Sequence, residues 1–119
     1  MEKRPPKISV LMSVRNGMPF VQQTVPSIVR QTFLDFEFVI VDNCSTDGSR
    51  EYLQKVAALE PRIRLVLNEK DLGHSGGLNR GLAECHGPWI ARIDADDIAL
   101  PNRLERQFAF VNENPDVVV

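Results

Sequence analysis

The chain has few of the features that mark disulfide-rich, membrane-spanning or nucleic-acid-binding proteins. Its two cysteines, Cys44 and Cys85, lie far apart without the spacing of metal ligands. A disulfide between them stays open, but free thiols suit a reducing compartment. No stretch approaches the ~20 apolar residues that a membrane span needs. The net charge is −2 and there is no basic stripe, so nucleic acid is not an expected partner.

The beginning of the sequence gives no sign of export. Residues 1–7 are charged and contain prolines, and no apolar run long enough for a signal peptide follows them. We therefore expect a cytoplasmic location, and leave open a membrane association of a longer parent chain.

The composition that remains is that of an ordinary globular domain. Hydrophobic residues make up 43% of the chain and charged residues 25%. A length of 119 residues suits one domain, and we treat residues 1–119 as a single unit. A chain of this size buries roughly 60–70% of its unfolded surface, which is enough for a core.

Short apolar runs alternate with helical patterns along the chain. We predict helices from Pro19, after Gly48, around Leu78 and from Pro101, with a kink or break at Pro26. The runs predict strands at residues 8–14, 36–41, 63–67 and 89–93, with a further strand at 117–119. This alternation predicts an α/β fold, in which helices cover both faces of a mainly parallel sheet.

Polar segments follow each of the first four predicted strands, at residues 13–17, 42–47, 68–77 and 94–97. In open parallel sheets, ligands bind at the carboxyl ends of the strands. The polar segments therefore predict one ligand site at that edge of the sheet.

The acidic segment at residues 94–97 is the main candidate for chemistry. In an extended stretch Asp94 and Asp96 point the same way, so both can face one divalent cation. Asp97 points elsewhere, and we assign it to the start of the following helix. A solvated acidic turn is the alternative, and the buried strand before the segment weighs against it.

Asp42 is the second candidate, because a lone carboxylate at a strand end can accept from a base N–H or a ribose hydroxyl. Its alternative role is to cap the turn that follows it. Ser13, Val14, Arg15 and Asn16 can present backbone groups to a base, and Arg15 either faces a phosphate or is a solvated loop charge.

A glycine-rich segment at residues 73–77 enters a predicted helix and suits an anion. It is neither a Walker loop nor a G-x-G-x-x-G fingerprint. Arg80, one turn further on, can approach a nucleotide. His74 and His86 lack a partner at ligand spacing, and we interpret both as structural.

Four segments together resemble the family 2 glycosyltransferases of the GT-A fold. The first is ISVLMSVRNG at residues 8–17, and the second is QTFLDFE at 31–37 followed by VDNCSTDG at 41–48. The third consists of Asn68, LG at 72–73 and LNRG at 78–81. The fourth is ARIDADDI at 91–98, followed by Pro101 and RLE at 103–105. The resemblance covers nearly the whole chain. Departures are Arg15 where the family usually has Tyr, Asn43 where a second Asp is commoner, and Cys44 in place of Gly.

The resemblance implies a Rossmann-like three-layer α/β/α sandwich and a role for each candidate. Asp42 would bind the base, commonly uracil, flanked by the segment from Ser13 to Asn16, and Arg80 would assist. Asp94 and Ala95 would contact the donor nucleotide-sugar. Asp96, with Asp94, would hold Mn²⁺ or Mg²⁺ at its diphosphate.

The resemblance also implies a longer parent protein. Members of this family run well beyond 119 residues, and their catalytic base and acceptor-binding part lie in the later half. We therefore expect a truncated, donor-binding chain without the base of this inverting reaction. The acceptor, a saccharide or a lipid-linked one, would bind the missing part.

Other interpretations stay open at this point. A strand edge left open by truncation favours a homodimer. The chain can also be a non-catalytic nucleotide-binding or interaction module. A Mg²⁺-dependent phosphatase of the haloacid dehalogenase type also places D-x-D after an apolar strand, but near the start of its chain.

Overall fold

The computed structural model of the 119-residue chain describes residues 5–113. Four parallel strands form one sheet in the order β3-β2-β1-β4. The strands are β1 (Ile8–Val14), β2 (Phe36–Asn43), β3 (Ile63–Asn68) and β4 (Trp89–Arg92). The helices are α1 (Val21–Val29), α2 (Ser49–Leu59), α3 (Gly73–Leu82) and α4 (Arg103–Glu113).

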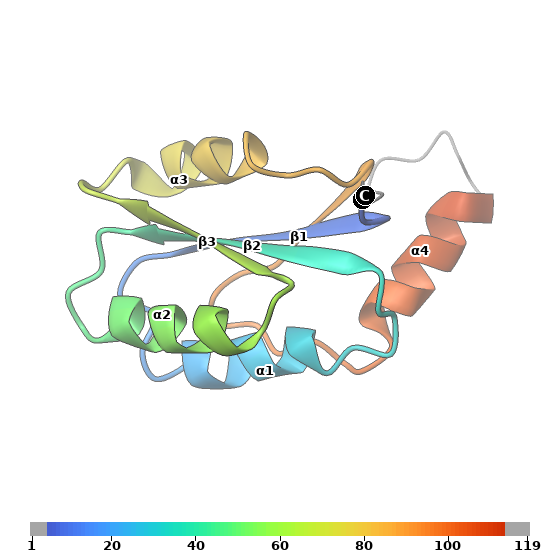
Figure 1. Cartoon of the computed structure of the whole chain (residues 1–119), viewed down its shortest axis with the longest axis horizontal. Coiled ribbons are helices and arrows are strands. Elements are labelled where there is room, and N and C mark those ends of the chain that lie inside the picture. Colours follow the sequence, from blue (N-terminus) through green and yellow to red (C-terminus); the bar gives the residue numbers. More distant parts are fainter. Residues whose placement is uncertain (1–4, 114–119) are drawn as a thin grey trace.

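The helices form two layers around the sheet. Helix α3 covers one face, and α1 and α2 cover the other, while α4 lies at the end opposite the arrowheads of the strands (Figure 1). All crossovers return to a parallel strand, so the carboxyl ends of the strands meet at one edge. The predicted α/β fold is confirmed.

Strands β1 and β2 form the centre of the core because side chains on both of their faces are apolar. Val10 and Met12 pack toward α1 and α2, and Leu11 packs with Val39 and Val41 toward α3. Continuous apolar runs are typical of parallel strands covered on both faces.

Helix α3 approaches the sheet closely because it carries glycine where it faces the strands. A Cβ on Gly81 would collide with side-chain atoms of Leu11 and Val41, and one on Gly77 would collide with Ser13 Oγ. This close approach brings the first turn of α3 up to the carboxyl ends of β1 and β2.

Several predicted boundaries differ from the structure. Residues 73–77, predicted to lead into a helix, form the first turns of α3, and Asn68, assigned to the polar segment after the strand, belongs to β3. Helix α1 continues through Pro26 and ends at Val29, so it is not broken there. The predicted strand at 117–119 lies outside the described residues.

Candidate functional site

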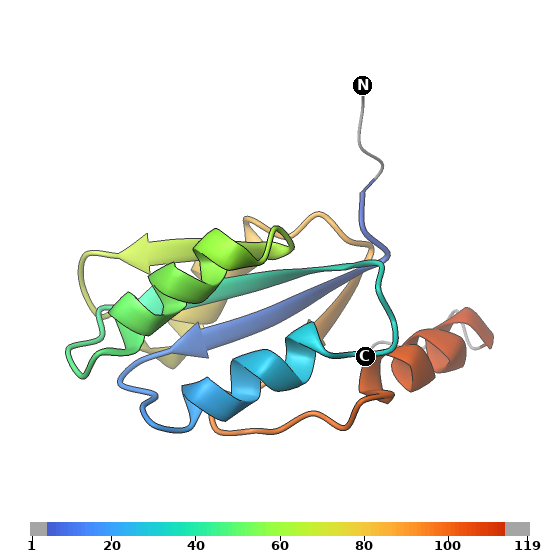
Figure 2. The same ribbon diagram turned by 60° about the horizontal axis from the view of Figure 1, so that its bottom comes forward.

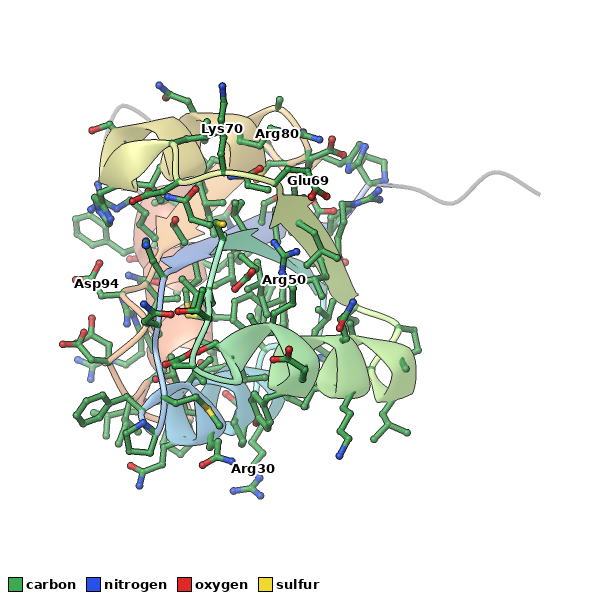
Figure 3. The ribbon with its side chains drawn as sticks, turned by 90° about the vertical axis from the view of Figure 1, so that its left-hand side faces the viewer. Arg30, Arg50, Glu69, Lys70, Arg80 and Asp94 are labelled. Carbon is green, nitrogen blue, oxygen red and sulfur yellow. The ribbon has the colours of Figure 1, made fainter. Side chains whose placement is uncertain are left out.

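A cleft of about 560 Å³ opens at the carboxyl edge of the sheet. It lies among the ends of β1, β2 and β4, the segment before α3 and the first residues of that helix. Figure 3 views the molecule from the left-hand side of Figure 1, toward which the strands point. The lining residues are Ser13, Arg15, Asn43, Asp71, Gly73, His74, Arg92, Asp94 and Ala95.

The loop after β1 is held by the loop after β2. The amide of Asn16, which has a left-handed backbone (φ 54°), donates to Ser45 Oγ at 2.9 Å, and its side-chain oxygen accepts from the amide of Thr46 at 2.8 Å. The Gly17 amide donates to Ser49 Oγ at 2.9 Å. Asn16 is therefore engaged in joining the two loops, and Val14 is buried in the core.

Asp47 strengthens this junction through three accepted hydrogen bonds. It accepts from the amides of Met18 and Ser49 at 3.0 Å each, and from Ser49 Oγ at 2.6 Å. Desolvation acts to raise the pKa of Asp47, but the hydrogen bonds from Ser49 and Met18 outweigh it and lower the pKa. The carboxylate form is the one that joins the loops.

Asn43 lies at the end of β2 and organises the wall formed by residues 68–73. Its Nδ2 donates to Asp71 Oδ1 and to the Gly73 carbonyl, both at 3.0 Å. Its Oδ1 accepts from Asn68 Nδ2 at 3.1 Å and from the Leu72 amide at 2.9 Å. The side chain thus uses both amide hydrogens and both carbonyl lone pairs.

Asp71 connects this wall to the opposite loop. Its Oδ1 also accepts from the Gly73 amide at 2.8 Å, while Oδ2 pairs with Arg15 Nε at 3.1 Å. Arg15 is exposed, and its predicted contact with a phosphate stays a prediction. It forms an ion pair at the rim of the cleft, joining the end of β1 to the segment before α3.

The acidic segment after β4 is held by α1. Thr24 Oγ1 donates to the Ala95 carbonyl at 2.7 Å, and the Ala99 amide donates to Ser27 Oγ at 3.0 Å. Gln31 Nε2 donates to the Leu100 carbonyl at 2.6 Å. Figure 2 shows this segment, in orange, running beside α1, in blue. Thr24 and Ser27 of α1, with Gln31 just beyond its end, thereby hold the side of the cleft that carries Asp94 and Ala95.

The segment itself is a turn and not the predicted extended stretch. The Asp97 amide donates to the Asp94 carbonyl at 3.0 Å, so Asp94 and Asp96 are not related by strand alternation. Asp94 lines the cleft, and Asp96 is exposed on the same turn. The assignment of Asp97 to the next helix is wrong, because α4 begins only at Arg103 and has Glu105 in its first turn.

Asp42 is fully buried at the end of β2. Arg50 Nε of α2 pairs with its Oδ2 at 2.7 Å, and the Ser45 amide donates to the same oxygen at 3.3 Å. The hydrogen bond with Asp42 raises the pKa of the Arg50 guanidinium, and desolvation partly offsets this rise. Among the described residues no donor reaches Asp42 Oδ1.

Arg80 does not line the cleft. It pairs with Glu84 Oε1 at 2.9 Å on the exposed side of α3, and Figure 3 shows it well away from Asp94. The contact of Arg80 with a nucleotide stays a prediction, and the position of Arg80 outside the cleft does not favour it.

Five lining residues were not identified as site residues from the sequence: Asn43, Asp71, Gly73, His74 and Arg92. His74, interpreted as structural, lies in the first turn of α3 with its Nε2 3.5 Å from Arg92 Nη2. Arg92 precedes Asp94 by two residues, and this alternation was a signal that could have placed both on one wall. His86, by contrast, does have a structural contact, with Glu37 at 3.2 Å.

The carboxylates at the cleft offer the hard oxygen donors that Mg²⁺ and Mn²⁺ prefer. Within residues 5–113 no group of three or more His, Cys, Asp or Glu side chains is arranged to hold an ion. Mg²⁺ commonly uses one or two carboxylates and completes its shell with water and substrate phosphate. Asp94 and Asp96 fit such a site in donor type. Each helix within residues 5–113 is too short or too polar to cross a membrane.

The known proteins that this sequence resembles include several glycosyltransferases. The Glycosyl transferase family 2 matches residues 9–119. An uncharacterized glycosyltransferase of Methanocaldococcus jannaschii is 37% identical over 114 residues, covering 94% of this chain and 39% of the relative. A putative teichuronic acid biosynthesis glycosyltransferase of Bacillus subtilis is 34% identical, covering 91% of this chain and 43% of its own length.

Solved structures agree. TarS 1–349 of S. aureus in complex with UDP-GlcNAc superposes with a TM-score of 0.82 at 27% identity, over 90% of this chain and 31% of that one. A mannosyltransferase of Pyrobaculum calidifontis, solved with GDP-Man and Mn²⁺, has a TM-score of 0.82 at 24% identity over 91% of this chain and 33% of that one, a likeness of fold.

The family match covers 111 of the 119 residues, from residue 9 to residue 119, and the fold is shared with GT-A transferases. It leaves no support for the phosphatase interpretation. The chain spans between 35% and 43% of the length of the first curated relatives. The chain belongs to glycosyl transferase family 2.

Proposed function

We propose that the chain is the donor-binding part of a glycosyltransferase that transfers a sugar from a nucleotide-diphosphate sugar to an acceptor hydroxyl with inversion. The observation that carries the proposal is the cleft that brings Ser13, Asn43 and Asp94 together from three strand ends. UDP is our first candidate for the nucleotide, because TarS 1–349 was solved with UDP and with UDP-GlcNAc.

The nucleoside would lie between the loop after β1 and the segment before α3. Ser13 and Arg15 form one wall of this space, and Asp71 forms part of the other. Asp42 does not line the cleft, and its buried Oδ1, for which no donor lies within the described residues, would accept from the base once the ligand gains access to it. Arg50 holds the other oxygen, so the acceptor has a fixed direction before the ligand arrives.

The diphosphate would lie toward the turn at residues 94–97. Asp94 and Asp96 would hold Mn²⁺ or Mg²⁺ there, and Ala95 would contact the donor. When bound, the ion would stabilise the negative charge that develops on the leaving nucleoside diphosphate. The turn is already fixed by its hydrogen bonds to α1, so the carboxylates need little reorganisation.

The remaining steps are assigned to residues outside this chain. A carboxylate beyond residue 119 would remove the proton from the acceptor hydroxyl, and the saccharide or lipid-linked acceptor would bind there too. This division rests on the relatives, which are more than twice as long as the part matched here.

Calorimetric titration tests the proposal directly. The chain is titrated with UDP, GDP and UDP-sugars, with and without Mn²⁺. We expect UDP to bind, and Mn²⁺ to tighten binding by about tenfold or more, which corresponds to roughly 1.4 kcal/mol. Asp96→Ala should remove the gain from Mn²⁺ while leaving the metal-free affinity nearly unchanged.

Asp97→Ala is the matched control, because Asp97 lies on the same turn and is also exposed. It should retain the gain from Mn²⁺. Failure of every nucleotide to bind the folded chain would refute the proposal.

A further inference from the structure

We propose that Arg92, oriented by His74, forms a phosphate-binding subsite for the nucleotide on the α3 side of the cleft. This inference rests on the proposed function and adds a residue to it that works independently of the metal. Three features support the subsite: the direction in which Arg92 points, the surroundings of its charge, and its position relative to Asp94.

Arg92 points to the α3 side of the sheet. It is the last residue of β4 and pairs in register with Leu11 of β1. Ile90, two residues earlier, packs with Leu11 in the cluster beneath α3, whereas Ala91 belongs to the core on the other face. Arg92 itself is exposed and lines the cleft, beside the first turn of α3.

The ring of His74 lies beside the guanidinium of Arg92. Its Nε2 lies 3.5 Å from Arg92 Nη2. A guanidinium only donates hydrogen bonds, so in this contact Nε2 has the role of acceptor. Arg92 has five N–H donors in a planar fork, and one of them is directed to His74. The others remain available to a ligand in the cleft.

The charge of Arg92 is not balanced by a neighbouring acid. No carboxylate of residues 5–113 lies within the 4.0 Å of an ion pair with it, whereas Arg15, the other arginine that lines the cleft, is paired with Asp71. Arg103 Nη2 donates to the Arg92 carbonyl at 3.1 Å, which brings a second cation close to the strand end. Arg92 therefore offers a positive charge without an acidic partner on the α3 side of the cleft, and an anion would pair with it.

The position of Arg92 favours phosphate as that anion. Arg92 precedes Asp94 by two residues, about 6–7 Å along an extended chain. A nucleotide diphosphate bound in the cleft with its phosphates toward the turn at 94–97 would bring them close to this strand end. The guanidinium fork matches two phosphate oxygens at once, which gives both strength and direction.

A ligand series separates this subsite from the metal site. The chain is titrated in EDTA with uridine, UMP and UDP, and with guanosine, GMP and GDP, by NMR chemical shifts that read millimolar affinities. In EDTA we expect Arg92→Gln to weaken the binding of UMP and UDP, or of GMP and GDP, by about tenfold, because charge-assisted hydrogen bonds are lost. The nucleoside affinity should change less than about twofold. His74→Gln should weaken the phosphates by a smaller factor.

Arg30→Gln is the matched control, because Arg30 is an exposed arginine that Figure 3 shows on the opposite side of the molecule from α3. It should change none of the affinities. If Arg92→Gln does not fold, Arg92→Lys replaces it, and should weaken the phosphates severalfold without affecting the nucleosides, because a lysine lacks the fork.

The outcomes distinguish the two proposals. If wild-type chain binds no nucleotide even with Mn²⁺, the proposed function fails and the subsite with it. If nucleotides bind but the Arg92 variant loses nucleoside and nucleotide affinity equally, or loses neither, the subsite alone is wrong.

Discussion

The carboxamide of Asn43 determines the shape of one cleft wall. It is almost completely buried and makes four hydrogen bonds, to Asp71, Gly73, Asn68 and Leu72. In two of these hydrogen bonds Asn43 donates, and in the other two it accepts. A carboxylate only accepts, so it cannot make all four. The commoner Asp of the family would not fit this particular network.

We therefore predict that Asn43→Asp destabilises the chain and weakens nucleotide binding. The variant loses two donated hydrogen bonds and places a carboxylate where Nδ2 lay, 3.0 Å from Asp71 Oδ1. The expected loss is about 2–4 kcal/mol of unfolding free energy. Because protonation removes the repulsion, the loss should shrink as the pH is lowered toward about 4, the ordinary carboxyl range. Urea denaturation at several pH values measures it.

Asn79→Asp provides the control, since Asn79 is exposed on α3. Its effect should stay within about 0.5 kcal/mol. A loss for Asn43→Asp that does not depend on pH would contradict the explanation by charge repulsion.

The individual site residues were predictable only in part. Strand ends and the family pattern identify Ser13, Arg15 and Asp94, and the structure places all three at the cleft. Nothing in the sequence indicates that Asp71 and Arg15 pair, because they are 56 residues apart and each is a plausible solvated loop charge. Side-chain pairing across loops depends on three-dimensional proximity that periodicity does not encode.

At the scale of elements, a hydrogen-bonded cluster around Glu37 lies at the amino ends of the strands, opposite the cleft. Ser9 Oγ donates to Glu37 Oε2 at 2.6 Å and accepts from the Gly87 amide at 2.8 Å. His86 contacts the same carboxylate through its amide and its ring. The cluster ties β1 and β2 to the turn that leads into β4, and so helps to place the strand that carries Arg92.

This cluster predicts a dependence of stability on pH. Burial acts to raise the pKa of Glu37, but hydrogen bonds from Ser9 and His86 outweigh it and lower the pKa. A lowered carboxyl pKa stabilises the fold above the ordinary carboxyl range, and the stabilisation is lost as the pH falls through the pKa of the folded state. Glu37→Gln should cost about 1–2 kcal/mol at neutral pH and less at acidic pH, in urea titrations.

His86→Gln isolates one part of the cluster. It removes the ring contact and retains the backbone amide, so its cost should be smaller than that of Glu37→Gln. A Glu37→Gln effect that stays constant from neutral to acidic pH would show that the carboxylate charge is not what stabilises the cluster.

The elements themselves were largely predictable, and their ends were not. The strands follow from apolar runs that are long enough to be buried on both faces. The start of α3 was missed because Gly73, Gly76 and Gly77 have low helix propensity, yet they lie in the helix. At Gly77 and Gly81 the close approach to the sheet outweighs that propensity.

At the scale of the whole molecule, the strand order β3-β2-β1-β4 explains how a short chain assembles the cleft. The two central strands supply Ser13 and Asn43, and β4 next to β1 supplies Arg92. Every described wall of the cleft therefore comes from within residues 13–95. The parallel sheet was predictable from the alternation of strands and helices, whereas that alternation alone does not determine the order of the strands.

We predict that this 119-residue chain binds the donor but transfers no sugar. The base and the acceptor-binding part are assigned to a region that its relatives have and this chain does not span. A radiolabelled UDP-sugar incubated with the chain, Mn²⁺ and candidate acceptors should give no glycosylated product above the protein-free blank. Product formation that Asp96→Ala abolishes would place the base within these residues.

The saturated hydrogen bonds of Asn43 have a consequence for how this protein can evolve. Positions 43 and 71 share a donor and an acceptor, so the effect of a substitution at one depends on the residue at the other. Asn43→Asp requires a partner that donates, which Asp71→Asn would supply, and that second exchange in turn leaves Arg15 without its anion. Acceptance of an acidic residue at position 43 is therefore expected to require accompanying changes at positions 71 and 15, which lie on other segments of the cleft.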